Sequence, residues 1–176
     1  MTRTFTVSDT IVIDTDPDTA YFHVSDPTRM GESSPENLGA AVADDRGQAY
    51  VGMVFDGRNK RGPAQWTTRC VVTAAEPGRR FAFRVRAIGL RTPRVPAPIA
   101  TWEYRFEPAD GGTRVTETWT DDRRIWPDIA ARVFDALATR GQTFADFQRG
   151  NIDRTLRQLK TVLEASGTTT AADATE

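Results

Sequence analysis

The stretch FADFQRGNIDRTLRQLKTVLE, residues 144–164, decides the fold of this chain. Its branched apolar side chains recur at steps of four, three and four, which places them on one face of an α-helix. They are Ile152, Leu156, Leu159 and Leu163. Phe144 and Phe147 extend this stripe toward the N-terminus, whereas Arg154, Arg157 and Lys160 lie mainly on the other faces. A stripe of this length needs a broad apolar surface to cover it, and the rest of the chain is expected to supply one.

The pattern predicts a helix over residues 128–164, beginning after Trp126-Pro127. Gly141 and Gly150 each destabilise a helix interior by about 1 kcal/mol relative to alanine. Thr143 and Asp146 resemble a capping box, which marks the start of a helix. The helix is therefore expected to be kinked or split near Gly141. Residues 166–176 are small and polar, and we predict that they form a disordered tail after a single domain over residues 1–165.

The first part of the chain predicts a strand and two short helices. Residues 4–14 alternate and end in the β-branched run 11–13, which is typical of a strand. Asp16-Pro17 and Asp26-Pro27 each place an N-cap side chain before a proline at the first helical position. Helices are therefore expected over 17–24 and 27–31.

Residues 36–121 predict about six strands that meander in an antiparallel sheet. The breaks between them are the turn-forming segments 44–47, 56–63, 76–78, 92–98 and 110–112. Alternation is clearest in 81–85 and 102–106, where aromatic residues share one face and charged residues the other. In the last strand, Glu117 shares a face with Val115 and Trp119, so a carboxylate lies among apolar neighbours.

Composition excludes several classes of function. A net charge of −1 over 176 residues gives no field that would attract nucleic acid. No apolar run approaches the roughly 18 residues of a membrane span, and the N-terminus lacks the apolar core of a signal peptide, so a cytoplasmic protein is expected. A single cysteine, Cys70, excludes an internal disulfide, and a single histidine, His23, excludes metal sites that need two imidazoles. No metal or other cofactor is expected, and a homodimer is an open alternative to a monomer.

Motifs spread over nearly the whole chain carry a family resemblance. They are Asp26-Pro-Thr-Arg-Met30 with Ser34-Pro-Glu36, Phe55-x-Gly57-x-Asn59, Trp66-x-x-x-Cys70-x-Val72, Glu76-Pro-Gly78, Trp102-x-Tyr104, Gly112-Thr-x-Val-Thr-Glu117, and Asn151-x-x-x-Thr155-Leu156-x-x-Leu159-Lys160. With the order β-α-α-β6-α, the chain resembles the START-like or SRPBCC superfamily, also labelled polyketide cyclase/dehydrase, and in particular a bacterial branch of it. Ser33 is a departure at the mouth of the pocket, because that branch often has tryptophan there.

The resemblance implies an α+β helix-grip fold, in which a curved antiparallel sheet of about seven strands wraps the long C-terminal helix. It also implies a hydrophobic cavity between them, which in relatives binds lipids, sterols, polyketides or aromatic compounds. Many members of this superfamily only bind or carry a ligand, so the resemblance does not imply catalysis.

Glu117 is the main candidate for chemistry. If it is buried on the concave face, its pKa is raised and it can act as an acid or base, or bind a ligand hydroxyl. The structural alternative is an ion pair with an inward arginine or a hydrogen bond from a backbone amide.

Glu36 and Asn59 are the polar candidates for the rim of the cavity. Both could orient a polar ligand head. Alternatively, Glu36 caps the start of a strand and Asn59 holds the turn predicted over 56–62. His23 and Cys70 are expected to be structural, the latter as a small buried hydrophobe.

The remaining candidate ligand-binding residues are aromatic, and each could equally belong to the core. They are Phe55, Trp66, Phe83, Trp102, Tyr104, Trp119, Phe134, Phe144 and Phe147. We therefore expect a protein that binds or carries a small hydrophobic molecule. The alternatives are an enzyme of the cyclase or dehydratase type that uses Glu117, and a module that binds another protein.

Overall fold

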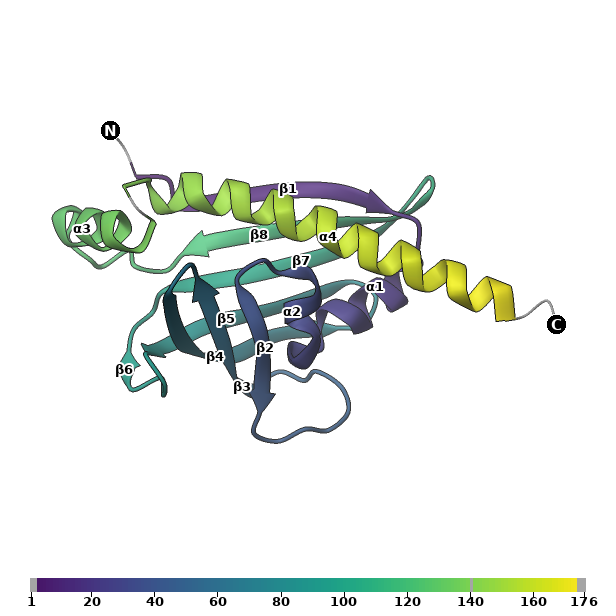
Figure 1. The fold of residues 1–176 in the computed structure, drawn as a ribbon, viewed down its shortest axis with the longest axis horizontal. Coiled ribbons are helices and arrows are strands. Elements are labelled where there is room, and N and C mark those ends of the chain that lie inside the picture. The colour runs from purple at the N-terminus through teal and green to yellow at the C-terminus, as the bar shows by residue number, and fades with distance from the viewer. Residues whose placement is uncertain (1–2, 140, 174–176) are drawn as a thin grey trace.

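The computed structural model describes residues 3–139 and 141–173, in which a curved antiparallel sheet lies against one long helix (Figure 1). The strand order is β1-β8-β7-β5-β4-β3-β2, and β6 pairs with β5. The strands are β1 (Thr6–Ile13), β2 (Asn37–Val42), β3 (Val54–Arg61), β4 (Ala64–Glu76), β5 (Arg80–Gly89), β6 (Val95–Pro96), β7 (Ala100–Ala109) and β8 (Gly112–Asp121). The helices are α1 (Pro17–Val24), the 3-10 helix η1 (Pro27–Arg29), α2 (Met30–Ser33), α3 (Asp128–Thr139) and α4 (Phe144–Asp173). This arrangement confirms the predicted helix-grip α+β fold.

Both Asp-Pro pairs begin helices, as predicted. The amide of Thr19 donates to Asp16 Oδ1 at 2.9 Å, and the amide of Thr28 donates to Asp26 Oδ1 at 2.9 Å. These bonds satisfy amides that have no partner within the first helical turn. The second helical segment, η1 and α2 together, ends at Ser33, slightly beyond the predicted end at residue 31.

The turn predicted over residues 56–63 is wrong for most of its length. These residues continue β3 to Arg61, and only Gly62-Pro63 turns the chain into β4. Gly57 lies opposite Thr68 in the sheet, where an added Cβ would meet Thr68 Oγ1 at 3.3 Å. Gly57 is therefore a position of close packing within a strand. The predicted break over 92–98 also contains β6, which pairs with residues 87–88 of β5.

The C-terminal helix is split, as the glycine and the capping pattern predicted. Gly141, between α3 and α4, has a φ of 95°, which is unfavourable for residues with a side chain. Thr143 Oγ1 accepts the amide of Asp146 at 3.1 Å and donates to the Asp146 carboxylate at 2.7 Å. The first of these bonds gives a partner to a backbone amide in the first turn of α4. The second helix therefore begins at the predicted capping pattern.

The predicted disordered tail differs from the structure over residues 166–173, which continue α4. Ser166 Oγ donates to the carbonyl of Val162 one turn earlier, at 2.9 Å, so this polar side chain is compatible with the helix. Residues 174–176 lie outside the described residues. Among the residues that the structure describes, no helix is both long and apolar enough to cross a membrane.

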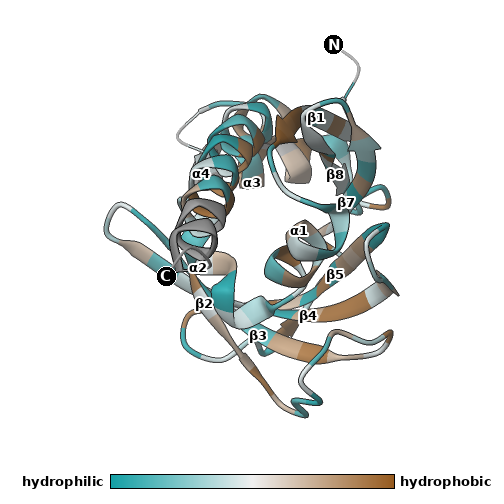
Figure 2. Cartoon of the chain, turned by 90° about the vertical axis from the view of Figure 1, so that its right-hand side faces the viewer, coloured by the Kyte–Doolittle hydropathy of each residue, from teal (hydrophilic) through white to brown (hydrophobic). Residues whose placement is uncertain are grey.

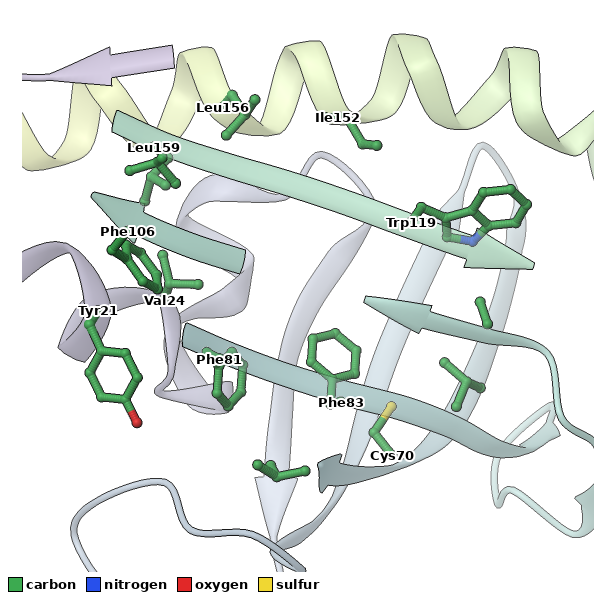
Figure 3. Packing of buried hydrophobic residues seen from close by; sticks show 14 of the residues in the cluster. Tyr21, Val24, Cys70, Phe81, Phe83, Phe106, Trp119, Ile152, Leu156 and Leu159 are labelled. Atoms are coloured by element: carbon green, nitrogen blue, oxygen red, sulfur yellow. The ribbon is translucent and has the colours of Figure 1, made fainter. Parts of the chain in front are cut away.

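The apolar stripe of α4 is buried against the sheet. Ile152, Leu156 and Leu159 point from the helix toward the strands (Figure 3), and each is at most 2% exposed. Polar contacts hold the helix along β1, because Lys160 Nζ donates to the carbonyl of Val12 at 2.7 Å and Glu164 accepts the amide of Asp14 at 3.0 Å. The helix therefore packs mainly on one edge of the sheet, on β1 and less on β8.

The rest of the sheet curves away from that edge (Figure 2). Irregularities in the β4–β5 pairing lie between Arg69 and Cys70 and between Val72 and Ala74. Such bulges bend the strand that carries them. Strands β3 and β4 are thereby placed opposite α4 with space between, and this space contains the candidate site.

Candidate functional site

A cavity of about 510 Å³ lies between the concave face of the sheet and α4. The short N-terminal helices contribute His23, Val24 and Met30 to its wall, and α3 contributes Phe134. Ser33 and Ser34, at the end of α2, also line it. A volume of this size is typical of sites for small organic ligands, which occupy roughly 300–1,000 Å³.

The structure brings nearly all the predicted site residues together around this cavity. Those that line it are Glu36, Phe55, Asn59, Trp66, Phe83, Trp102, Tyr104, Glu117, Trp119, Phe134 and Phe144. Phe147 is not among the lining residues. Phe147 follows Phe144 by three residues, which in an α-helix places the two side chains about 60° apart around the axis. The Arg61 guanidinium lies over the Phe147 ring, 3.8 Å from its centroid.

Aromatic rings form much of the wall. The ring of Trp119 stacks on Phe144 with centroids 5.6 Å apart, and joins the sheet to the first turn of α4. On the facing wall, Phe55 and Phe83 make an edge contact at 5.3 Å. In Figure 3, Phe83 and Trp119 project toward the same interior from β5 and β8, which are separated in the sheet by β7. Such a wall offers flat apolar faces to a ligand that contains rings.

Glu117 lies in the interior of this wall. It is 1% exposed, with the buried Val115 and Trp119 on either side of it on the same face of β8. Tyr104 is its cross-strand neighbour on β7, and the Tyr104 hydroxyl donates to Glu117 Oε1 at 2.9 Å. This partner differs from both structural alternatives considered from the sequence, an inward arginine and a backbone amide. Among the residues that the structure describes, Glu117 Oε2 has no hydrogen-bond partner.

Burial raises the pKa of Glu117 to about 8, opposed by the hydrogen bond from Tyr104 and assisted by the negative charge of Asp9. Asp9 lies opposite Glu117 on the edge strand β1. Burial also raises the pKa of Tyr104 well above its usual value, and the neighbouring Glu117 adds to this effect. At neutral pH the pair is therefore a hydroxyl and a protonated carboxyl, without net charge.

Glu36 and Asn59 have partners within the protein. Glu36 forms a two-pronged ion pair with Arg61, whose Nη2 donates to Glu36 Oε2 at 2.9 Å. Asn59 Nδ2 donates to the Gly57 carbonyl and to Thr68 Oγ1, both at 3.2 Å. Asn59 lies within β3, so it does not hold a turn over 56–62. Both residues line the cavity, with the Glu36 carboxylate and the Asn59 amide nitrogen already engaged.

Sequence reasoning missed a polar face of α4 that lines the cavity. It consists of Gln148, Asn151 and Thr155, which are all at most 5% exposed. Their spacing of three and four residues is visible in the sequence beside the apolar stripe. Polar residues in that position normally face water, so only the curvature of the sheet reveals that they face an enclosed space.

His23 and Cys70 also line the cavity, and both are buried. Burial lowers the pKa of His23, so its imidazole is neutral near pH 7, with the Arg29 charge acting in the same direction. Burial raises the pKa of the Cys70 thiol to about 12, which removes the thiolate needed for nucleophilic attack. Within residues 3–139 and 141–173, the histidine, cysteine and acidic side chains form no group of three that could hold a metal ion.

Solved structures with the same fold include proteins of several bacteria. CV1439 from Chromobacterium violaceum aligns with 92% of this chain and 99% of its own, with a TM-score of 0.63 and 13% identity. The di-domain ARO/CYC protein StfQ, from the steffimycin biosynthetic pathway, aligns over 93% of this chain and 52% of its own, with a TM-score of 0.66 and 16% identity. The Polyketide_cyc-like protein Cgl2372 from Corynebacterium glutamicum is 29% identical over 97% of this chain and 90% of its own, with a TM-score of 0.50.

No curated protein matches this sequence. The model of one protein family, described as polyketide cyclase/dehydrase and lipid transport, matches residues 4–164. That range contains the sheet, the short helices and every residue that lines the cavity. The chain therefore belongs to the polyketide cyclase/dehydrase and lipid transport family.

Proposed function

We propose that this protein binds and carries a small hydrophobic molecule in the cavity between the sheet and α4. The cavity itself is the observation that supports this function most directly, because it has the volume of a ligand site and a wall rich in aromatic side chains. A hydrophobic ligand in this cavity would gain van der Waals contacts with the apolar wall. Membership of a family that includes lipid transport agrees with this role.

Native mass spectrometry tests this proposal. The protein is expected to retain one small molecule after purification from cells, or to acquire one after incubation with a lipid extract. Thr68→Phe and Ile88→Trp reduce the cavity from the sheet side, because both residues line it, and both variants should retain less ligand. Leu90→Trp is the matched control, because Leu90 is 82% exposed and its replacement leaves the cavity unchanged. Ligand-free protein in both experiments would contradict the proposal.

A second candidate function is an acid–base reaction of the cyclase or dehydratase type in the same cavity. It is favoured by Glu117, whose pKa of about 8 and unpaired Oε2 allow it to donate and recover a proton near neutral pH. Binding is preferred because the volume and aromatic wall of the cavity support it directly, whereas the reaction depends on Glu117 alone. If a substrate is found, Glu117→Gln should abolish turnover, and full turnover by that variant would remove Glu117 from the reaction.

A further inference from the structure

Among the described residues, four that line the cavity have a buried polar atom without a hydrogen-bond partner. They are Glu117 Oε2, Trp119 Nε1, Asn151 Oδ1 and His23 Nε2. His23 Nε2 lies 3.8 Å from the Glu32 carboxylate, which leaves the other three as the main groups for a ligand. Their residues line the cavity and are at most 5% exposed. Most buried polar atoms in folded proteins have a partner, because an unpaired one loses the hydrogen bonds that water made to it. Such atoms around one cavity are positions at which a ligand could supply the missing hydrogen bonds.

We propose, on the basis of the function proposed above, that the ligand is an uncharged ring compound bearing a hydrogen-bond acceptor and a hydroxyl group. Glu117 and Trp119 on the sheet bind the acceptor, and Asn151 on α4 binds the hydroxyl.

The chemistry of the three atoms defines these roles. The indole N–H of Trp119 can only donate a hydrogen bond. Glu117 Oε1 accepts from Tyr104, so in the protonated carboxyl Oε2 carries the proton and donates. Asn151 Nδ2 donates to Gln148 Oε1 at 3.4 Å, which leaves Asn151 Oδ1 as an acceptor. These three atoms therefore present two donors and one acceptor.

The positions of these groups also constrain the ligand. Glu117 and Trp119 are two residues apart on one face of β8, so their backbones are about 7 Å apart. Asn151 approaches from α4, and Trp119 also stacks on Phe144 of that helix. A rigid body with polar groups at both ends can therefore reach the sheet and the helix together while its faces contact the aromatic wall.

The charges around the cavity disfavour a carboxylate. Among the described residues that line it, Arg61 is the only arginine or lysine, and it is paired with Glu36. Arg123 is buried nearby against the Phe144 ring, but it is paired with Asp121 and Asp135. A ligand carboxylate would be buried without a counter-ion of its own, which is unfavourable in a low-dielectric interior.

Three naphthalenes of matched shape test the proposal. 6-Hydroxy-2-acetylnaphthalene carries a ketone and a hydroxyl, 2-isopropylnaphthalene is its hydrocarbon counterpart, and 6-hydroxy-2-naphthoate is a charged analogue. Affinities are measured by competition against a bound fluorescent dye. The hydroxyketone is expected to bind at least about tenfold more tightly than either of the others, which corresponds to about one good hydrogen bond.

Variants test whether the three residues cause the preference for the hydroxyketone. Trp119→Phe, Glu117→Leu and Asn151→Leu remove one polar group each. Each variant should bind the hydroxyketone about tenfold more weakly, while its affinity for the hydrocarbon should change by less than about twofold. Glu117→Gln should recover most of the affinity that Glu117→Leu loses, because the amide can still accept from Tyr104 and donate to the ketone. Binding of the hydrocarbon also reports on folding, since a misfolded variant would not bind the hydrocarbon either.

The outcomes separate the ligand class from the function itself. Equal binding of the hydroxyketone and the hydrocarbon, or tighter binding of the naphthoate, overturns the ligand class but leaves a hydrophobic carrier. Binding of none of the three, together with the absence of a retained molecule in native mass spectrometry, overturns both.

Discussion

The Tyr104 hydroxyl donates a hydrogen bond of 2.9 Å to Glu117 Oε1 across two neighbouring strands, inside the wall of the cavity. The two residues are direct cross-strand partners, so the register of β7 and β8 brings them together. Burial raises the pKa of both groups, and together they form a neutral polar pair in apolar surroundings. Stability and ligand binding should therefore both depend on the protonation of Glu117.

The first prediction concerns the pH dependence of stability. The pKa of Glu117 is about 8 in the fold, against 4.5 for the ordinary side chain. Between these values the folded state holds a proton that the unfolded state releases, so the free energy of unfolding falls as pH rises. The slope contributed by this group is at most about 1.4 kcal/mol per pH unit. Glu117→Gln should remove this slope, as measured by urea unfolding from pH 4 to pH 9.

A matched control is Glu107→Gln on β7, where the carboxylate is exposed. This variant should keep the pH dependence of the wild-type protein. If the slope of Glu117→Gln equals that of the wild type, Glu117 is already ionised at neutral pH and the assignment of a neutral pair fails.

The second prediction concerns Tyr104. Tyr104→Phe removes the hydrogen bond that lowers the pKa of Glu117, so this pKa should rise further. The variant also leaves both oxygens of a buried carboxyl unpaired, which should reduce the free energy of unfolding at pH 6 by about 1–3 kcal/mol. Carbon-detected NMR titration of the glutamate carboxyls measures the first effect. Tyr50→Phe, in a loop that does not line the cavity, should leave the pKa of Glu117 unchanged. A lower pKa for Glu117 in Tyr104→Phe would contradict the prediction.

The third prediction concerns the buried ion cluster that joins α3 to the sheet. Arg123 is fully buried and contacts Asp121 at 2.9 Å and Asp135 of α3 at 2.7 Å. Arg123→Met leaves these carboxylates without their main counter-ion, and should reduce the free energy of unfolding by about 3–5 kcal/mol. The neighbouring Arg124 is exposed. Arg124→Met should change the free energy of unfolding by less than about 0.5 kcal/mol. Similar losses of stability in the two variants would show that the buried ion pairs of Arg123 do not stabilise the fold more than an exposed arginine does.

The fourth prediction concerns Cys70. Burial raises its pKa to about 12, so the native protein should react with iodoacetamide at pH 8 only through unfolding. Mass spectrometry should find no adduct within an hour in buffer and complete modification in 6 M guanidinium chloride. Rapid modification in buffer would show that solvent reaches the cavity wall at this position.

The sequence alone predicted the elements whose causes are local. Aspartate before proline predicted α1 and the segment that follows it, and Thr143 with Asp146 predicted the start of α4. The alternation around Phe83 and Tyr104 predicted which side chains share the concave face, because strand periodicity follows from the backbone. The glycine at position 57 misled the turn prediction, because its cause is close packing against Thr68 on another strand.

For the candidate site, the sequence identified the aromatic wall and Glu117 but not what surrounds them. The bond from Tyr104, the pairing of Glu36 with Arg61 and the inward face of Gln148, Asn151 and Thr155 depend on strand register and on the bulges of β4. Residues that meet in these contacts are mostly far apart in the chain, and nothing local encodes their distances. The amino-acid pattern determined that one face of each element is apolar, whereas tertiary packing decided where those faces meet and where they enclose a cavity, because the curvature of a sheet is a property of all its strands together.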